Sequence, residues 1–285
     1  MCLEKAIELM GVGKSYGGFA LRDISFDLPS GSILGLVGEN GAGKTTIIKL
    51  IMNAIRRDSG SIRVLGQDNQ QPDFARLKQD IGVVLDEAYF PNVLTPRQVE
   101  RVMRHTYVNW DKEQFFDYLR RFALPLDKSF MEFSRGMKMK LAIAVALSHS
   151  PRLLILDEAT SGLDPMVREE ILDIFNDFTR SEEHSVLLSS HIVSDLEKIC
   201  DYIAFVHQGQ LLFCEEKDLL LDEYALVNLS HGDFEALPEE AVLGCRQTQF
   251  GVKALVRKHE IASAFVTEHT NLEDIILFLA KGEKR

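Results

Sequence analysis

The chain has 285 residues, of which 46% are hydrophobic, and its formal net charge is −11. This length allows one large domain, or a domain of about two hundred residues with a small appendage, and the negative charge argues against bulk attraction to nucleic acid or an anionic membrane. No uncharged apolar run reaches the roughly 18 residues that span a bilayer, and the start lacks a basic region leading into an apolar core, so we expect neither a membrane-spanning nor a secreted chain. The four cysteines are scattered without metal-ligand spacing, which is typical of reduced thiols in a cytosolic protein.

Two strands are expected near the start of the chain, at residues 7–10 and 24–28. They are joined by a turn-rich stretch, residues 11–18, which contains Tyr16. A tyrosine in such a loop can stack its ring on a bound base, or it can pack against the edge of the sheet. The pattern leaves both roles open for Tyr16.

The most specific pattern in the chain follows the apolar run at residues 33–37. It satisfies G-x-x-x-x-G-K-[ST] and precedes apolar residues at helical spacing, which is the strand, loop and helix context of a P-loop; a chance match in a glycine-rich turn is the less favoured alternative. Its glycines allow backbone N–H groups to turn toward a polyphosphate at the positive end of the helix. Lys44 would reach the terminal phosphates, and the Thr45 hydroxyl would take a Mg²⁺ position. The residues expected to hold the nucleotide here are Gly38, Glu39, Asn40, Gly41, Ala42, Gly43, Lys44, Thr45 and Thr46.

After a short strand at residues 61–66, an apolar strand at residues 81–86 ends in the carboxylate of Asp86. Residues 87–150 then change character, because apolar residues recur at helical spacing and prolines separate the segments. Aromatic and basic residues mingle there, which fits either a partner-facing surface or ordinary amphipathic packing. We therefore predict a helical insertion with helices at residues 95–108, 112–122 and 136–147.

Two adjacent carboxylates, Asp157 and Glu158, follow four apolar residues. At the carboxyl end of a buried parallel strand, Asp157 would hold Mg²⁺, mostly through its water shell, and Glu158 would polarise an attacking water. Acids at a strand exit can also be merely solvated, but the preceding P-loop makes that less favoured. Next, residues 161–165 predict a turn into a helix, with Asp164 as the N-cap.

A further buried strand at residues 186–191 ends in His191. A lone histidine is usually structural, but this one would share a sheet edge with Asp157, within reach of a terminal phosphate or the attacking water. A hairpin is expected at residues 202–213. Beyond about residue 220 the pattern weakens, and we predict a small accessory domain with strands at residues 224–229, 242–249 and 252–256 and a closing helix at residues 272–279.

Taken in order, these motifs resemble the nucleotide-binding subunit of ABC transporters over about residues 1–215. The family's motifs fall at Tyr16 (the adenine-stacking aromatic), residues 38–46 (Walker A), 153–158 (Walker B), 161–164 (the D-loop) and His191 (the switch histidine). The resemblance implies an α/β fold of the P-loop NTPase class, with a mixed core sheet, an antiparallel β subdomain and a helical subdomain near residues 87–150. This nucleotide-binding domain would cover residues 1–220, and a small α+β domain would cover residues 221–285.

Two departures from the family pattern stand out. The segment Phe-Ser-Arg-Gly-Met at residues 133–137 occupies the place of the signature LSGGQ, with Arg135 for the first glycine and Met137 for the glutamine. Ser134 and Gly136 keep the hydroxyl and the N–H that, in the family, contact the γ-phosphate from the opposite subunit. Asp86 replaces the Q-loop glutamine; it would bind Mg²⁺ through a water or leave that position partly vacant, which puts coupling to the membrane partner in doubt.

The resemblance implies a dimer, of identical or similar chains, that sandwiches ATP and Mg²⁺. The residues it implies are Glu158, His191 and Lys44 for catalysis, Ser134, Gly136, Met137 and Asp164 as further nucleotide contacts, and Thr45, Asp157 and Asp86 for the metal. Such a subunit would power a separate polytopic permease from the inner face of the cell membrane, docking through the helical insertion and residues 86–97. Bacterial exporters of drugs and of amphipathic peptides, including phenol-soluble modulins, are the branch that it resembles.

Two other functions stay open: an ABC-type ATPase that acts on DNA or ribosomes, and a nucleotide-dependent regulatory module with little hydrolysis. The sequence shows no long coiled coil, zinc module or second cassette, so no nucleic acid is expected as a partner. Glu158 and His191 argue against a merely regulatory role, whereas Asp86 leaves that role open.

Overall fold

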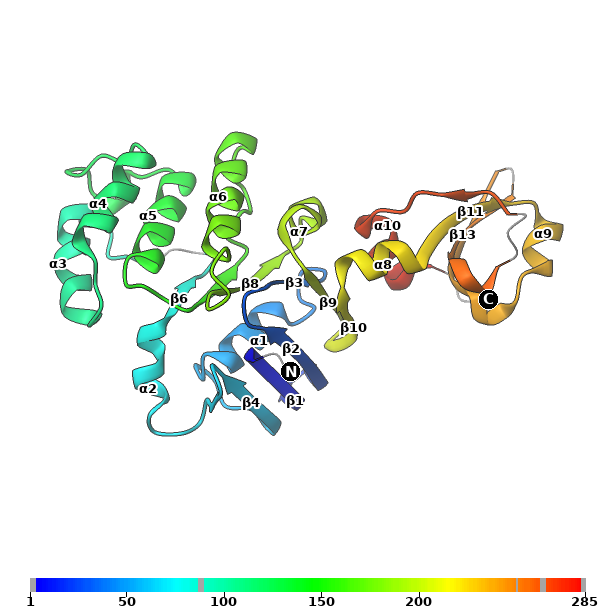
Figure 1. Ribbon diagram of the computed structural model, residues 1–285, viewed down its shortest axis with the longest axis horizontal. Coiled ribbons are helices and arrows are strands. Elements are labelled where there is room, and N and C mark those ends of the chain that lie inside the picture. Colours follow the sequence, from blue (N-terminus) through cyan, green and yellow to red (C-terminus); the bar gives the residue numbers. More distant parts are fainter. Residues whose placement is uncertain (1–3, 87–89, 250, 262–264, 283–285) are drawn as a thin grey trace. The chain divides into compact units, whose positions relative to one another are not determined.

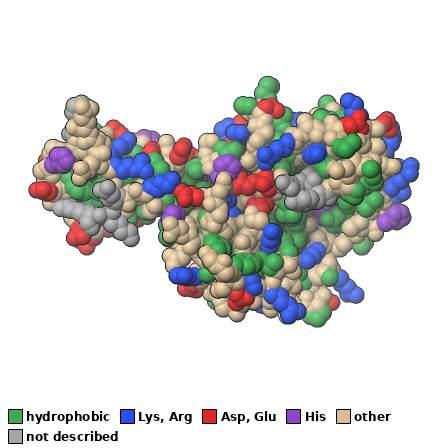
Figure 2. Space-filling view, turned by 180° about the vertical axis from the view of Figure 1, so that it is seen from behind, with side chains coloured by type: hydrophobic (Ala, Val, Ile, Leu, Met, Phe, Trp, Pro, Cys, Tyr) green, Lys and Arg blue, Asp and Glu red, His purple; other side chains and the backbone are tan. Residues whose placement is uncertain are grey.

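The computed structural model of the chain describes residues 4–86, 90–249, 251–261 and 265–282 (Figure 1). It divides into two compact units, Met1–Leu212 and Phe213–Arg285. The division falls within strand β10 (Gln210–Glu216), a few residues before the boundary at residue 220 that the sequence suggested. On the face drawn in Figure 2, acidic and basic side chains are interspersed.

The first unit begins with an antiparallel sheet in the order β2-β1-β4-β5. Its strands are β1 (Lys5–Tyr16), β2 (Phe19–Pro29), β4 (Ser59–Val64) and β5 (Gln67–Asp68). A turn was predicted at residues 11–18. The structure contradicts this prediction at residues 11–16, because β1 continues to Tyr16. Gly11 has a φ of 60°, and the register with β2 shifts between Leu9 and Val12, so the glycine forms a bulge within the strand instead of ending it. Tyr16 is therefore the last residue of a strand and not a loop residue.

A six-stranded sheet in the order β10-β9-β3-β8-β7-β6 forms the centre of this unit. Strand β3 pairs in parallel with β8 and β9, and β7 pairs in parallel with β6 and β8. Because parallel strands end at one edge of the sheet, the segments after β3, β7 and β8 come together there. The strands are β3 (Ile33–Val37), β6 (Ile81–Val84), β7 (Leu153–Asp157), β8 (Ser185–Ser190) and β9 (Tyr202–His207), and the accompanying helices are α1 (Lys44–Ile51), α2 (Phe74–Leu77), a 3₁₀ turn (Lys78–Asp80), α6 (Pro165–Phe178) and α7 (Val193–Ile199).

The helical insertion contains α3 (Pro96–Thr106), α4 (Lys112–Arg121), a 3₁₀ turn (Phe130–Glu132) and α5 (Arg135–Leu147). All three predicted helices are confirmed, and local caps explain where they start: Thr95 and Gln98 form a capping box before α3, and Asp111 caps α4. Helix α5 contacts β6 and α4, and residues 141–147 are buried. Residues 87–89, the start of the predicted insertion, lie outside the described residues. Within the described parts of the chain, no helix combines the length and apolar character needed to cross a membrane.

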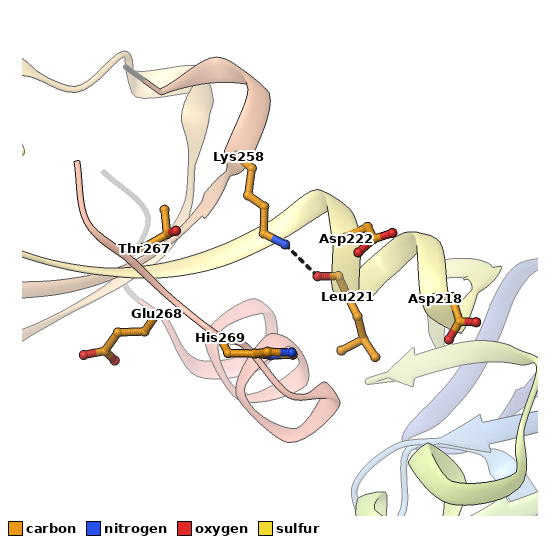
Figure 3. Close-up of a pocket in the computed structure, with 7 residues that line it drawn as sticks. All are labelled: Asp218, Leu221, Asp222, Lys258, Thr267, Glu268 and His269. Carbon is orange, nitrogen blue, oxygen red and sulfur yellow. Dashed lines mark hydrogen bonds between the residues drawn. The ribbon is translucent and has the colours of Figure 1, made fainter. Parts of the chain in front are cut away.

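The second unit is a four-stranded sheet in the order β12-β13-β11-β14 with short helices. Its elements are α8 (Lys217–Glu223), β11 (Tyr224–Leu229), α9 (His231–Ala236), a 3₁₀ turn (Glu239–Ala241), β12 (Val242–Thr248), β13 (Gly251–Arg257), a 3₁₀ turn (Lys258–Glu260), β14 (Thr267–Glu268) and α10 (Leu272–Lys281). The predicted strands and closing helix are confirmed, whereas α8, α9 and β14 were not predicted. A pocket of about 440 Å³, where Lys258 Nζ donates to Leu221 O at 2.9 Å, is lined by Asp218, Leu221, Asp222, Lys258, Thr267, Glu268 and His269 (Figure 3).

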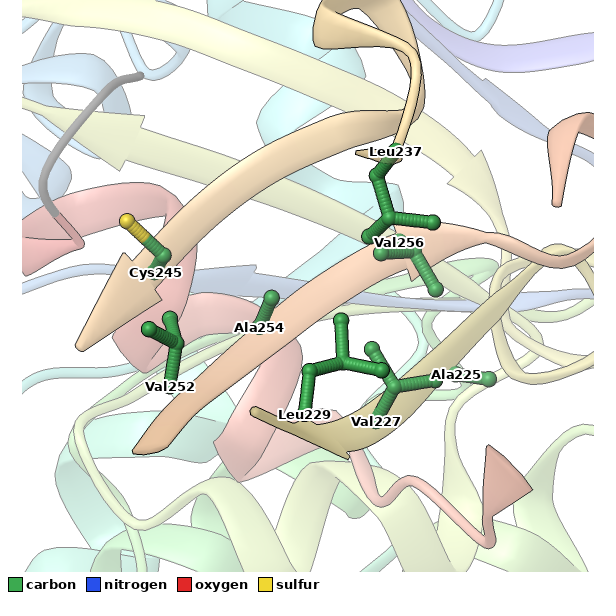
Figure 4. Packing of buried hydrophobic residues seen from close by; sticks show 8 residues of the cluster. All are labelled: Ala225, Val227, Leu229, Leu237, Cys245, Val252, Ala254 and Val256. Atoms are coloured by element: carbon green, nitrogen blue, oxygen red, sulfur yellow. The ribbon is translucent and has the colours of Figure 1, made fainter. Parts of the chain in front are cut away.

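This unit has a hydrophobic core of its own (Figure 4). Alternate residues of β11 and β13 point to one face of the sheet, as the period of a strand requires, and Val227 pairs directly with Ala254. Leu237 and Cys245 complete that cluster. Helix α10 contacts β12 and β13 and buries Leu272, Ile275 and Phe278.

The observed architecture confirms the predicted fold class. A mixed core sheet, an antiparallel sheet and a helical insertion make up the first unit, and a small α+β unit follows.

Candidate functional site

The loop between β3 and α1 is shaped by close approach to its neighbours. A Cβ added at Gly38 would lie 2.3 Å from the Val206 carbonyl oxygen, and one at Gly43 would lie 2.5 Å from Leu21 Cδ2. Gly43 also has a φ of 116°, which L side chains rarely adopt, and no side chain caps helix α1 behind it. The loop thus presents the uncapped N-terminal turn of α1, where N–H groups favour an anion.

A pocket of about 260 Å³ opens at this loop. It brings the loop together with Asp86, which follows β6, and Glu158, which follows β7. Phe19, at the start of β2, also lines it, and sequence reasoning missed this residue; the available signal was an aromatic residue directly after Gly17 and Gly18. The lining residues are Phe19, Glu39, Asn40, Gly41, Gly43, Lys44, Thr45, Thr46, Asp86 and Glu158.

The Lys44 ammonium is buried at the base of the loop, with its side chain 6% exposed. Its Nζ lies 2.7 Å from Gly38 O, 3.4 Å from Glu39 O and 3.3 Å from Glu158 Oε1. The two carbonyl oxygens accept hydrogen bonds from Nζ, and the Glu158 carboxylate forms an ion pair with it. Glu158 is the only carboxylate among these three partners.

Glu158 holds its place through an unusual backbone. Its φ is 52°, in the left-handed region, and its N–H lies 3.1 Å from Ser189 O and 3.2 Å from Ser189 Oγ. Such a conformation in a residue with a side chain costs about 1–3 kcal/mol and occurs where the surrounding structure imposes it, often at functional sites. Contacts to strand β8 impose it here.

Ser189 also controls the neighbouring carboxylate. Its hydroxyl donates to Asp157 Oδ1 at 2.5 Å, and both residues are buried. The two are direct partners in the parallel ladder of β7 and β8. Sequence reasoning missed Ser189, although a polar residue inside an apolar strand, two positions before His191, was a visible signal.

His191 emerges from the end of β8 beside Glu158. Its Nδ1 lies 2.6 Å from Glu158 Oε2, and its side chain is 45% exposed. Together with Lys44, His191 therefore engages both carboxylate oxygens of Glu158. A carboxylate held in this way at the mouth of an anion-binding loop is placed to accept a proton from a bound water.

Other predicted site residues lie elsewhere in a single copy of the chain. Ser134 caps α5, where its Oγ accepts from Met137 N at 3.3 Å, and Gly136 lies in the first turn of that helix. Asp164 caps α6, as predicted, by accepting from the Val167 N–H at 3.1 Å. Tyr16 is 48% exposed, with Lys14 Nζ 5.6 Å from its ring centroid. Within the described residues, the pocket lining includes none of Tyr16, Ser134, Gly136, Met137 and Asp164.

The oxygen donors near the pocket fit a hard cation. Thr45 lines the pocket, and Asp157 lies at the end of the adjacent strand. The third candidate, Asp86, accepts from Arg135 Nη2 at 2.9 Å through its Oδ1. Among the described residues, no group of three or more His, Cys, Asp or Glu side chains is arranged to hold a metal. Mg²⁺ commonly keeps several waters and is completed by phosphates, so it needs few protein ligands.

Comparison with known proteins identifies similar chains among ATP-binding proteins. Residues 21–161 match the family model described as ABC transporter. The chain is 31% identical over 225 residues to the ABC transporter ATP-binding protein YtrB of Bacillus subtilis, covering 79% of this chain and 76% of that protein. It is 34% identical to the lantibiotic transport ATP-binding protein SrtF of Streptococcus pyogenes (74% and 91% covered) and 32% identical to the bacitracin transport ATP-binding protein BcrA of Enterococcus faecalis (74% and 70% covered).

Solved structures share the fold. The ATP-binding subunit of an ABC transporter superposes with a TM-score of 0.67 at 26% identity and covers 75% of this chain and 91% of its own. A dimeric ATP-binding cassette in a post-hydrolysis state, bound to ADP and phosphate, gives a TM-score of 0.66 at 20% identity and covers 74% and 98%.

Proposed function

This chain belongs to the ABC transporter family, and on that premise we propose that it is the ATP-binding and ATP-hydrolysing subunit that powers a separate membrane-spanning permease. The observation that supports the ATPase chemistry is the Glu158 carboxylate, which is held between Lys44 and His191 at the pocket. The P-loop supplies the phosphate site, and Glu158 supplies the group that orients a water.

The residues of the pocket define a sequence of contacts. The ammonium of Lys44 hydrogen-bonds to two carbonyl oxygens and pairs with Glu158, so a phosphate oxygen that binds it would compete with these partners. Glu158 is the partner it would exchange, since a phosphate oxygen replaces one anion by another. The freed Glu158 oxygen then accepts from the attacking water, while His191 keeps the other oxygen in place. Mg²⁺, held by Thr45 and through water by Asp157, would offset negative charge on the phosphates.

A second copy of the chain would complete the site. Ser134, Gly136, Met137 and Asp164 lie outside the pocket lining in one copy. We assign them to the nucleotide of a partner subunit, identical or similar, in a head-to-tail dimer. Tyr16, exposed at the end of β1, would take the adenine. In such an assembly the triphosphate joins the two subunits, and its cleavage allows them to separate.

An exposed apolar surface supports docking of the permease to the helical insertion. Val93 is 79% exposed and Met131 is 69% exposed, and their segments are joined by a hydrogen bond from Met131 N to Asn92 O at 3.0 Å. Val93 lies shortly before helix α3, and Met131 lies in the 3₁₀ turn at Phe130–Glu132. Exposed apolar side chains that lie close together are typical of a protein contact. Docking there would hold the chain at the inner face of the membrane.

The named relatives support a cargo class. SrtF is a lantibiotic transport protein and BcrA a bacitracin transport protein, and lantibiotics and bacitracin are both peptides. We therefore propose that the permease exports drugs or amphipathic peptides.

Isolation of native complexes in mild detergent tests this function. We expect the full-length chain to bring down a polytopic membrane protein and to hydrolyse ATP. A Val93→Asp/Met131→Asp variant should lose that partner, whereas Val108→Asp, at a residue 86% exposed outside this surface, should retain it. Recovery of ribosomes, nucleic acid or a soluble regulator in place of a membrane protein would contradict the proposal.

A further inference from the structure

Two of the three residues that depart from the family pattern, Arg135 and Asp86, contact each other. Arg135 is the first residue of α5, and its Nη2 lies 2.9 Å from Asp86 Oδ1, although 49 positions separate them. Asp86 follows β6 and lines the nucleotide pocket. The pair therefore joins the helical insertion to the rim of that pocket.

Arg135 contacts a third segment as well. A Cβ added at Gly162, whose φ is 68°, would lie 2.9 Å from Arg135 Nη1 and 3.1 Å from its Cζ. The guanidinium group therefore packs directly over the Gly162 backbone, in the turn before α6. A planar guanidinium suits such a surface, and a compact ammonium would not cover it in the same way.

The charges that line the pocket link the Arg135–Asp86 contact to nucleotide binding. Among the described residues, the pocket lining contains three carboxylates, Glu39, Asp86 and Glu158, and one cation, Lys44. Lys44 opposes Glu158, so Asp86 would repel a polyphosphate unless another cation offset its charge. Arg135 is 2.9 Å away and supplies that cation.

We propose that Arg135 is a positioning residue for the nucleotide pocket: its guanidinium, packed on Gly162, holds and neutralises the Asp86 carboxylate at the pocket rim. Nucleotide affinity then depends on the pair, and an unpaired Asp86 weakens binding more than the loss of both charges. The proposal rests on the ATP-binding function above.

A double-mutant cycle on the full-length protein tests this proposal. Equilibrium binding of a non-hydrolysable Mg·ATP analogue, together with the KM and kcat of hydrolysis, is measured for Arg135→Gln, Asp86→Asn, the double variant and Arg135→Lys. Arg135→Gln should raise Kd and KM about fivefold, the scale of one exposed charge pair, with a smaller change in kcat. The double variant should return to within about twofold of wild type, and Arg135→Lys should recover only part of the affinity, because lysine restores the charge but not the planar contact.

A control ion pair is formed by two residues outside the nucleotide-pocket lining given above. Arg180 contacts Asp177 at 2.9 Å and is also exposed, so Arg180→Gln should leave both constants unchanged. Urea midpoints should agree among all variants, because an exposed ion pair contributes little to folding.

Wild-type affinity in Arg135→Gln, or equal weakening in the single and double variants, would overturn the proposal while leaving the ATPase function standing. Absence of analogue binding by the wild-type protein would overturn both.

Discussion

His191 Nδ1 lies 2.6 Å from Glu158 Oε2, although the residues follow different strands and stand 33 positions apart. Lys44 takes the other carboxylate oxygen at 3.3 Å. Each partner restricts one oxygen, so the Glu158 carboxylate has a defined orientation before any nucleotide enters. A base that is already oriented avoids paying that ordering entropy during the reaction.

Replacing Glu158 by glutamine should separate binding from turnover. The amide keeps the size of the side chain but cannot accept a proton from water, so phosphate release should fall by about a hundredfold or more while nucleotide affinity is kept. The measurement compares phosphate release with binding of labelled ATP. Glu169→Gln, at an exposed residue paired with Lys198, is the control. Full ATPase activity in Glu158→Gln would rule out the role assigned to Glu158.

Removing the Ser189 hydroxyl should impair the use of Mg²⁺. Asp157 is buried and loses its 2.5 Å hydrogen bond in Ser189→Ala, which frees its carboxylate to turn away from the metal position. We expect the Mg²⁺ concentration for half-maximal activity to rise about tenfold, as is common when a group that orients a metal ligand is lost.

The matched control is Ser190→Ala. Ser190 is also buried, but its Oγ accepts from Ile192 N, whereas the Ser189 hydroxyl donates to Asp157. If both serine variants show the same Mg²⁺ dependence, Ser189 does not orient Asp157.

Acid should destabilise the fold through His149. The residue is fully buried, its Nδ1 lies 2.9 Å from Gln79 O, and its ring stacks on Tyr107 at a centroid distance of 3.9 Å. Burial lowers the pKa of His149, so the unfolded chain binds this proton more readily than the folded one. The resulting stability is present above the unfolded pKa of about 6.5 and is lost as the pH falls through the lower folded pKa.

The urea midpoint of unfolding, measured by the fluorescence of the single tryptophan, Trp110, should therefore decrease as the pH is lowered from about 7.5 to about 5.5. The fall should be smaller in His149→Phe, which keeps an aromatic ring but cannot titrate. His105→Phe, at an exposed histidine, should retain the wild-type slope. An unchanged slope in His149→Phe would show that other groups cause the acid sensitivity.

The second unit should respond to loss of its own core. Val227 is 1% exposed within the cluster of Figure 4, so Val227→Ala should lower the unfolding free energy of this unit by about 2 kcal/mol. Hydrogen exchange of the β11 and β13 amides measures this directly. Leu219→Ala, at a residue of the same unit that is 57% exposed, should have little effect. If hydrogen-exchange protection falls equally in Val227→Ala and Leu219→Ala, the core assigned to this unit is wrong.

Local patterns predicted those parts of the fold that neighbouring residues specify. The predicted cap Asp164 lies within a turn of the helix it starts, and the apolar runs of β3 and β7 report burial directly. The bulge at Gly11 was mistaken for a turn because a glycine with positive φ serves in either context. Helices α8 and α9 are too short for apolar periodicity to reveal them.

The sequence by itself determined which chemical groups this protein has: the glycines and lysine of the P-loop, the carboxylates at the end of β7 and the histidine after β8. These groups were identified from residue types at a fixed spacing along the chain, so no tertiary information was needed to find them. Only the tertiary structure decided which groups meet, because parallel strand pairing joins Asp157 to Ser189 across 32 positions and packing of α5 brings Arg135 to Asp86 across 49. Such pairings depend on strand register and helix packing, which are set by burial over the whole unit. A polar residue such as Ser189 in an apolar strand can signal a role, but it does not identify the partner.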